Sequence, residues 1–128
     1  LALGVAAIAG IKSLEILRRD GQYEKLRGFG HQVQDMIRKA LDPVGIGYRI
    51  VGDPTLFEIV FTDAKPRTYR DVLGGDAAAG KVWNDTLRAQ GIFKSPGKTY
   101  PSLALTDADM EMTSHAISEA AKAVAQLG

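Results

Sequence analysis

Residues 48–61 read YRIVGDPTLFEIVF, and this stretch decides the fold class. Two runs rich in β-branched and aromatic residues flank a turn-forming Gly-Asp-Pro at residues 52–54. The runs predict two antiparallel strands, 48–51 and 56–61, joined as a hairpin. Because side chains alternate along a strand, the second strand should present two different faces. We expect Phe57, Ile59 and Phe61 on one face, and Leu56, Glu58 and Val60 on the other.

Two helices are expected before the hairpin, at about residues 3–19 and 22–41. Gly21 separates them, because glycine readily takes the left-handed conformation that ends a helix. The second helix carries apolar residues at three- and four-residue spacing, which predicts a stripe facing the core. Pro43 ends this helix. The stripe consists of Leu26, Phe29, Val33, Ile37 and Leu41.

Further elements are expected after the hairpin. A short helical turn at 69–73 precedes a helix at 77–90, and Thr106 caps a final helix. Residues 92–94 and 100–105 are expected to be short extended segments. This order predicts an α+β fold, with a small mostly antiparallel sheet of three to four strands, helices packed on one face, and a long linking helix in front. The inward residues of the last two helices are Val82, Trp83, Leu87, Met110, Ile117, Ala121 and Val124.

The composition excludes several classes of protein. The 128 residues suit one domain with a core of its own, and 16 basic against 15 acidic residues give a net charge of +1. This near-neutral charge argues against a nucleic-acid-binding protein, which usually carries an excess of basic residues. The absence of cysteine excludes disulfides and thiolate metal sites, and fits a cytoplasmic protein.

The first eleven residues, LALGVAAIAGI, form an apolar run. The run is too short to span a membrane and has no basic leader of the kind that signal peptides carry. We expect a helix buried closely against another surface. Because no Ser, Thr, Asp or Asn caps its start, we also expect the helix to begin upstream and the chain to be one piece of a larger protein.

Most constellations of catalytic residues are missing from the sequence. His31 and His115 have no partner at the spacing of metal ligands, and the two Gly-x-Gly strings, 28–30 and 45–47, do not follow a strand. We find no nucleophile elbow and no paired carboxylates. We therefore expect no catalytic, cofactor-binding or metal-binding residue in this chain.

The loop KSPGKTYPS, residues 94–102, is the best candidate for binding. It carries two lysines and one tyrosine and contains two prolines. Such a loop suits contact with a carboxylate or a phosphate. The alternative is an ordinary solvated connection.

Five strings, taken in order along the chain, resemble one protein family. They are LGVAAIAGIKSLEIL at 3–17, YEKL at 23–26, VGDPTLFEIVFTD at 51–63, and GIF at 91–93 followed by LALTDAD at 103–109. Together they are similar to the C-terminal small domain of class III, pyridoxal-phosphate-dependent aminotransferases, above all those like glutamate-1-semialdehyde aminomutase. The similarity covers nearly the whole chain.

The resemblance implies that residues 1–20 form the linking helix and that residues 21–128 form the small domain of a dimeric enzyme. It implies pyridoxal phosphate (PLP) as the cofactor, a large PLP-binding domain of the same enzyme as a partner, and an amino acid or amino aldehyde as substrate. In this family the cofactor lysine lies in the large domain, and no motif here matches it. The chain alone is therefore expected to be inactive.

The resemblance also suggests how this domain contributes to the site, since the corresponding loop in the family faces the substrate. We hypothesise that Lys98 pairs with a substrate carboxylate and that Tyr100 packs over it. The hairpin stretch 55–57 is a second candidate for the pocket, with Thr55 as its substrate contact, and core packing is the alternative for this stretch. Aminotransferase and aminomutase activity both stay open. Two other interpretations stay open as well: a stand-alone binding or dimerisation module without catalysis, and an anion-binding regulatory domain that uses the same loop.

Overall fold

The structure, a computed structural model, describes residues 2–128 and confirms the α+β class. Two helices, α1 (Ala2–Leu17) and α2 (Gln22–Leu41), come first, and the 3-10 turn η1 (Asp42–Val44) follows. The strands β1 (Arg49–Asp53) and β2 (Leu56–Val60) form the hairpin. The chain then forms α3 (Tyr69–Leu73), α4 (Ala77–Ala89) and α5 (Asp107–Ala125).

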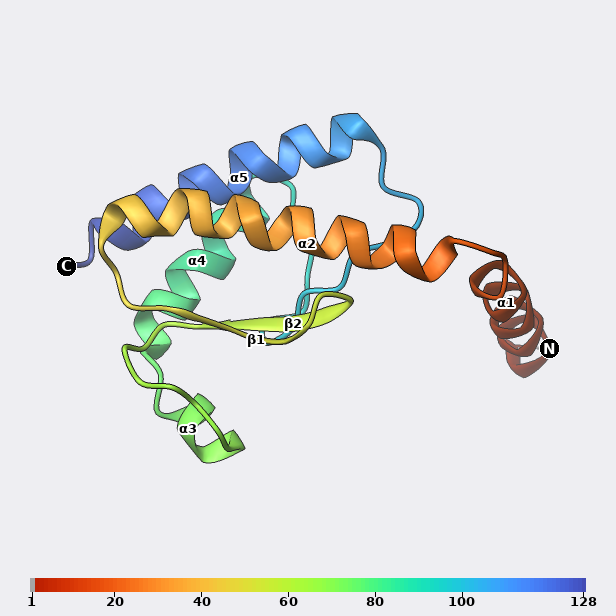
Figure 1. Ribbon diagram of the computed structural model, residues 1–128, viewed down its shortest axis with the longest axis horizontal. Helices are drawn as coiled ribbons and strands as arrows, with labels where there is room; N and C mark the ends of the chain where they lie inside the picture. The colour runs from red at the N-terminus through yellow and green to blue at the C-terminus, as the bar shows by residue number, and fades with distance from the viewer. Residues whose placement is uncertain (1) are drawn as a thin grey trace.

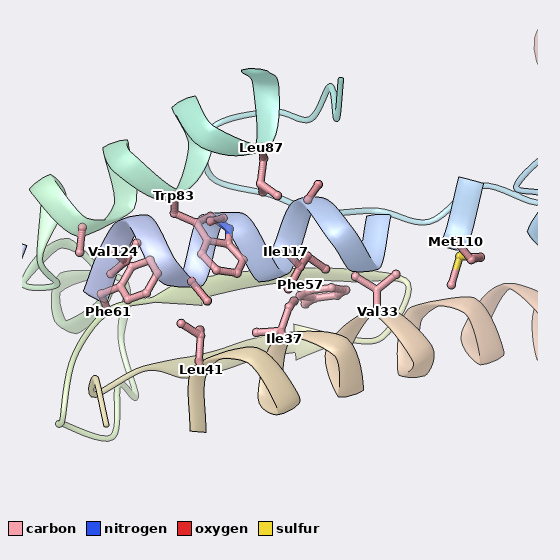
Figure 2. Close-up of a cluster of buried hydrophobic side chains, with 14 residues drawn as sticks. Val33, Ile37, Leu41, Phe57, Phe61, Trp83, Leu87, Met110, Ile117 and Val124 are labelled. Atoms are coloured by element: carbon pink, nitrogen blue, oxygen red, sulfur yellow. The ribbon is translucent and has the colours of Figure 1, made fainter. Parts of the chain in front are cut away.

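Three helices cover one side of the hairpin. Figure 1 shows α2, α4 and α5 above the strands, with α3 below them and α1 projecting from one end. α2 and α4 both pack against α5. Figure 2 shows the core that they enclose, in which the rings of Phe61 and Trp83 meet edge to face with centroids 5.8 Å apart. The buried core residues include Val33, Ile37, Leu41, Phe57, Leu87, Met110, Ile117, Ala121 and Val124.

The predicted stripes are largely confirmed. On α2 the last three residues of the stripe are buried, while Leu26 and Phe29 are half-buried. The inward residues predicted on α4 and α5 are buried as well, apart from Val82, which is half-buried against the core. Thr106 caps α5 as predicted: its side chain accepts from the backbone N–H of Asp109, and the Asp109 carboxylate accepts from that of Thr106.

The predicted sheet of three to four strands is not confirmed. The described residues form a sheet of two strands, extended only by a single bridge between Phe57 and Thr99. Their backbone groups exchange hydrogen bonds of 3.0 and 2.8 Å. Pro96 and Pro101 flank this bridge, and a proline has no N–H to donate to a ladder. The extended segments expected at 92–94 and 100–105 therefore do not become strands.

The predicted alternation of side chains along β2 is confirmed, but the face opposite the core is partly covered as well. Phe57 and Phe61 are buried in the core, and Ile59 packs against it, as expected. Val60, however, is buried on the opposite face. The turn after α3 covers it: a Cβ added to Gly75 would lie 2.8 Å from Val60 Cγ1. Both faces of this end of β2 are therefore packed.

The helix expected to be buried at the start of the chain is exposed in this structure. None of Ala2–Leu17 is buried, and several large apolar side chains of α1 are more than half exposed. No helix in the described part of the chain has the length and apolar character needed to cross a membrane. The large apolar side chains exposed on α1 are those of Leu3, Val5, Ile8, Ile11 and Leu14.

Candidate functional site

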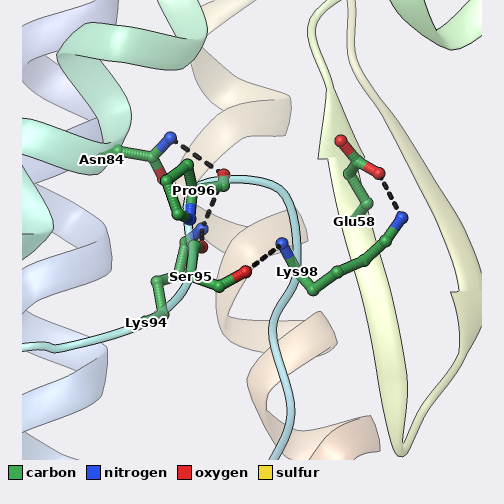
Figure 3. A network of polar contacts seen from close by, with 6 residues as sticks. All are labelled: Glu58, Asn84, Lys94, Ser95, Pro96 and Lys98. Atoms are coloured by element: carbon green, nitrogen blue, oxygen red, sulfur yellow. Dashed lines mark hydrogen bonds and ion pairs between the residues drawn. The ribbon is translucent and has the colours of Figure 1, made fainter.

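The loop of residues 94–100 lies between α4 and β2 (Figure 3). Gly91 ends α4 in the left-handed conformation (φ 87°) and turns the chain back, and the N–H of Ile92 bonds to the carbonyl of Leu87. The loop then reaches Thr99, where it pairs with Phe57 on β2. Its two ends are thus fixed to the core.

On the α4 side, the carbonyl oxygen of Pro96 holds the loop. It accepts from Asn84 Nδ2 at 3.1 Å and from Lys94 Nζ at 3.2 Å, and Lys94 Nζ also donates to the carbonyl of Ser95 at 2.8 Å. Burial lowers the pKa of Lys94, while the charge of Glu58 acts in the opposite direction. Lys94 is therefore a half-buried cation that serves to hold the loop backbone.

On the strand side, an ion pair holds the loop. Lys98 Nζ lies 2.5 Å from Glu58 Oε2, and the N–H of Lys98 donates to Ser95 Oγ at 3.1 Å. The lysine side chain is 51% exposed and the glutamate side chain 22%. Lys98, one of the predicted site residues, is accessible to solvent but already has an anionic partner.

Two pockets of similar size lie beside this loop. One, of about 280 Å³, is bounded by β2, α3, α4 and the loop, and Glu58, Asn84 and Lys94 line it together with apolar side chains. The other, of about 250 Å³, lies between the loop and the start of α5 and has Tyr100 in its wall. Lys98 reaches the face of β2 that carries Glu58, so the structure does not show Tyr100 stacked over Lys98.

Thr55, the third predicted site residue, lies in the hairpin turn. Its backbone N–H and its hydroxyl both donate to Asp53 Oδ1, at 3.0 and 2.8 Å. Asp53 also pairs with Arg27 of α2 at 2.9 Å. The hydroxyl of Thr55 therefore stabilises the turn, and the structure does not bring it together with Lys98.

The described residues do not fit a PLP site of their own. Both loop lysines have partners, the Lys94 ammonium with two backbone carbonyls and Lys98 with Glu58. The N-terminus of α4 would suit a phosphate, but Asp76 Oδ1 already accepts from the N–H groups of Ala78 and Ala79 there. Within residues 2–128 no three metal-ligating side chains gather, and His31 and His115 are both exposed.

Sequence reasoning found the loop but missed two residues that hold it. Glu58 interrupts an otherwise apolar strand, and this was the available signal for a polar partner. Asn84 follows the buried Trp83 on α4, and its Oδ1 is buried without a partner in the structure. Neither position could be assigned to the loop without knowing which segments meet in space.

The fold matches that of several solved proteins, among them transaminases and proteins solved with PLP. An omega-transaminase from Sphaerobacter thermophilus superposes with a TM-score of 0.78 over 91% of this chain, at 20% identity, and the match covers 27% of that protein. The FumI protein of Sphingopyxis sp. MTA144, solved as its PLP internal aldimine, gives 0.74 over 92% of this chain, at 24% identity, and covers 26% of that protein. At this level of identity the likeness establishes the fold.

Proteins similar in sequence indicate the enzyme family that this chain resembles. Glutamate-1-semialdehyde 2,1-aminomutase of Neisseria meningitidis serogroup C is 33% identical over 92 residues, which are 72% of this chain and 22% of the relative. The same enzyme of Methanopyrus kandleri is 28% identical over 119 residues, 91% of this chain and 28% of the relative. No protein-family model matches the chain. The chain thus spans less than a third of the length of these relatives. The predicted resemblance to the aminotransferase and aminomutase family is confirmed.

Proposed function

We propose that this chain is the C-terminal small domain, with its linking helix, of a PLP-dependent class III aminotransferase or aminomutase. Residues 1–20 would form the linking helix and residues 21–128 the domain. One observation carries the proposal: alignments to glutamate-1-semialdehyde aminomutases cover 72 to 91% of this chain but only 22 to 28% of the relatives. The large domain would hold the cofactor, which supplies an electron sink for amino-group chemistry.

In this proposal the domain shapes the substrate side of the active site. Lys98 would present its ammonium to a substrate carboxylate from a loop that Asn84 and Glu58 hold on both sides. Tyr100 and Thr55, which lie apart in this structure, would contact the substrate from two separate points of the domain. A homodimeric, cytoplasmic parent enzyme acting on an amino acid or amino aldehyde completes the proposal.

The test uses the full-length protein that contains this chain. Borohydride reduction fixes PLP to its lysine, and peptide mapping then locates the modified residue. We expect a pyridoxyl-lysine outside residues 1–128. A full-length protein that binds no PLP, or a label on Lys94 or Lys98, would contradict the proposal.

A second assay separates the two reaction types. The holoenzyme is incubated with glutamate 1-semialdehyde, with and without a 2-oxo acid as amino acceptor. An aminomutase needs no acceptor because the amino group returns to the same carbon skeleton. An aminotransferase turns the substrate over repeatedly only when the acceptor is present; without it, at most one equivalent per active site is converted.

The alternative is a binding or dimerisation module without catalysis. The five large apolar side chains exposed on α1 support it, since an apolar face of this kind marks an interaction surface. This alternative expects no PLP in the full-length protein, so borohydride mapping also decides between the two.

A further inference from the structure

The Glu58–Lys98 pair bears on how this loop would receive an anionic substrate. Glu58 Oε2 lies 2.5 Å from Lys98 Nζ. The pair connects two residues that are separated by 40 positions in the sequence. The lysine is the more exposed member, at 51% against 22% for the glutamate. The carboxylate is therefore the fixed partner, and the ammonium is the end that an incoming group can reach.

The position of Glu58 on β2 explains why it stays beside the loop. The neighbouring side chain of Phe57 is buried in the core on one face, so Glu58 must project from the other. There the loop passes close above it, since a Cβ on Gly97 would lie 3.5 Å from Glu58 Oε1. Strand packing thus fixes the direction in which the Glu58 side chain leaves β2, independently of Lys98.

Glu58 also faces the second lysine of the loop. Its charge raises the pKa of Lys94, against the larger lowering by burial. Among the carboxylates that the structure describes, Glu58 alone lies within ion-pair distance of either lysine. The two lysines outnumber this glutamate, although Asp76 also lines the pocket that Glu58 and Lys94 share.

From this arrangement we infer that Glu58 is a specificity-determining residue that competes with the substrate carboxylate for Lys98. The inference rests on the proposed function, in which Lys98 is the carboxylate-binding cation. A ligand carboxylate that binds Lys98 must compete with Glu58 for the same ammonium, so weakly positioned anions bind less well. Removing the charge of Glu58 should therefore strengthen the binding of anions, although it removes a contact from the protein itself.

The test measures binding of glutarate, a five-carbon dicarboxylate, to the full-length holoenzyme by calorimetry. The variants are Glu58→Gln, Lys98→Ala and the double variant. Partly exposed ion pairs are weak, so we expect Glu58→Gln to tighten binding by about three- to fivefold and Lys98→Ala to weaken it. In the Lys98→Ala background, Glu58→Gln should have no further effect. The matched control is Glu119→Gln, which breaks a similar pair with Lys122 on α5 and should change nothing.

Several results would overturn the inference. These are unchanged or weaker glutarate binding in Glu58→Gln, an equal gain in the Lys98→Ala background, and no detectable binding in any variant. A purely structural role for Glu58 predicts the weaker binding, because the loop would lose one of its two attachments to β2. The PLP content of each sample is measured in parallel. Normal PLP with the wrong glutarate response rejects only this inference, whereas absence of PLP rejects the proposed function.

Discussion

Gly30 of α2 lies directly against the hairpin turn at Pro54. A Cβ built on Gly30 would stand 2.0 Å from the carbonyl oxygen of Pro54, although the position is helical and buried. Arg27 and Asp53 pair beside this contact at 2.9 Å. The missing side chain is thus what allows the turn to approach the helix and to place β2 under the core.

Gly30→Ala should therefore destabilise the protein. The added methyl meets backbone atoms that cannot move aside, and overpacking of this kind costs about 1–3 kcal/mol. Gly28→Ala is the matched control, because a Cβ there meets nothing within 4 Å. Replacing an unhindered helical glycine by alanine should stabilise by roughly 0.5–1 kcal/mol. Urea denaturation measures both changes, and equal effects of the two substitutions would contradict the predicted close contact.

The capping box at Thr106 should make part of the stability depend on pH. Hydrogen bonds from the backbone N–H and the hydroxyl of Thr106 lower the pKa of Asp109. The stabilisation is present above the ordinary carboxyl pKa of about 3.9 and is lost as pH falls through the lower folded-state pKa. Asp109→Asn should therefore be less stable than wild type at neutral pH, and the difference should shrink in acid. A difference that does not depend on pH would exclude this role of the charge.

The hydroxyl of Tyr48 should lose its proton only at unusually high pH. Burial, a 2.5 Å hydrogen bond from its hydroxyl to Asp42 Oδ1 and the charge of that carboxylate raise its pKa to about 12. Because the folded-state pKa is raised, the stabilisation is complete below the unfolded value of about 10 and is lost as pH rises through the folded value. Absorbance titration should show a tyrosine that forms its phenolate near pH 12, and Tyr48→Phe should remove this step. Tyr69, which is 75% exposed, gives the control variant Tyr69→Phe.

Elements set by local pattern were predictable from the sequence. The bounds of α2 and α3 coincide with the predicted ranges because a glycine break, an apolar stripe and a following proline mark α2, and polar flanks mark α3. The capping residue Thr106 was found for the same reason. Such features depend on residues within a few positions of one another.

Features that depend on distant contacts were not predictable. Val60 is buried only because the turn at Gly75, 15 positions on, covers it. Within residues 2–128, two prolines leave Thr99 as the one residue that bridges to β2, so no third strand forms, and the sequence does not show how far the pairing extends. The loop was found by its lysines and prolines, but its partner Glu58 is 40 positions from Lys98.

The exposed apolar face of α1 should make the isolated 128-residue chain self-associate. Ile8 and Ile11 are 68% and 59% exposed, and contiguous apolar surface of this kind drives association in water. The double substitution Ile8→Lys, Ile11→Lys should shift the chain toward monomer in sedimentation velocity. Gln32→Lys, at an exposed position of α2, adds a charge away from this face and serves as the control. A monomeric wild-type chain at high concentration would contradict the prediction.

Lys98→Ala should impair the full-length enzyme selectively toward acidic substrates. If the Lys98 ammonium binds the substrate carboxylate, its loss removes a charge-assisted hydrogen bond of about 1.5–3 kcal/mol, which is roughly a 10- to 150-fold rise in KM. The KM of a neutral amino donor should change little, because it has no side-chain carboxylate to lose. Lys81→Ala is the control, since this lysine of α4 is exposed and pairs with Asp85 on the same helix. An unchanged kcat/KM for the acidic substrate would show that Lys98 only holds the loop to Glu58.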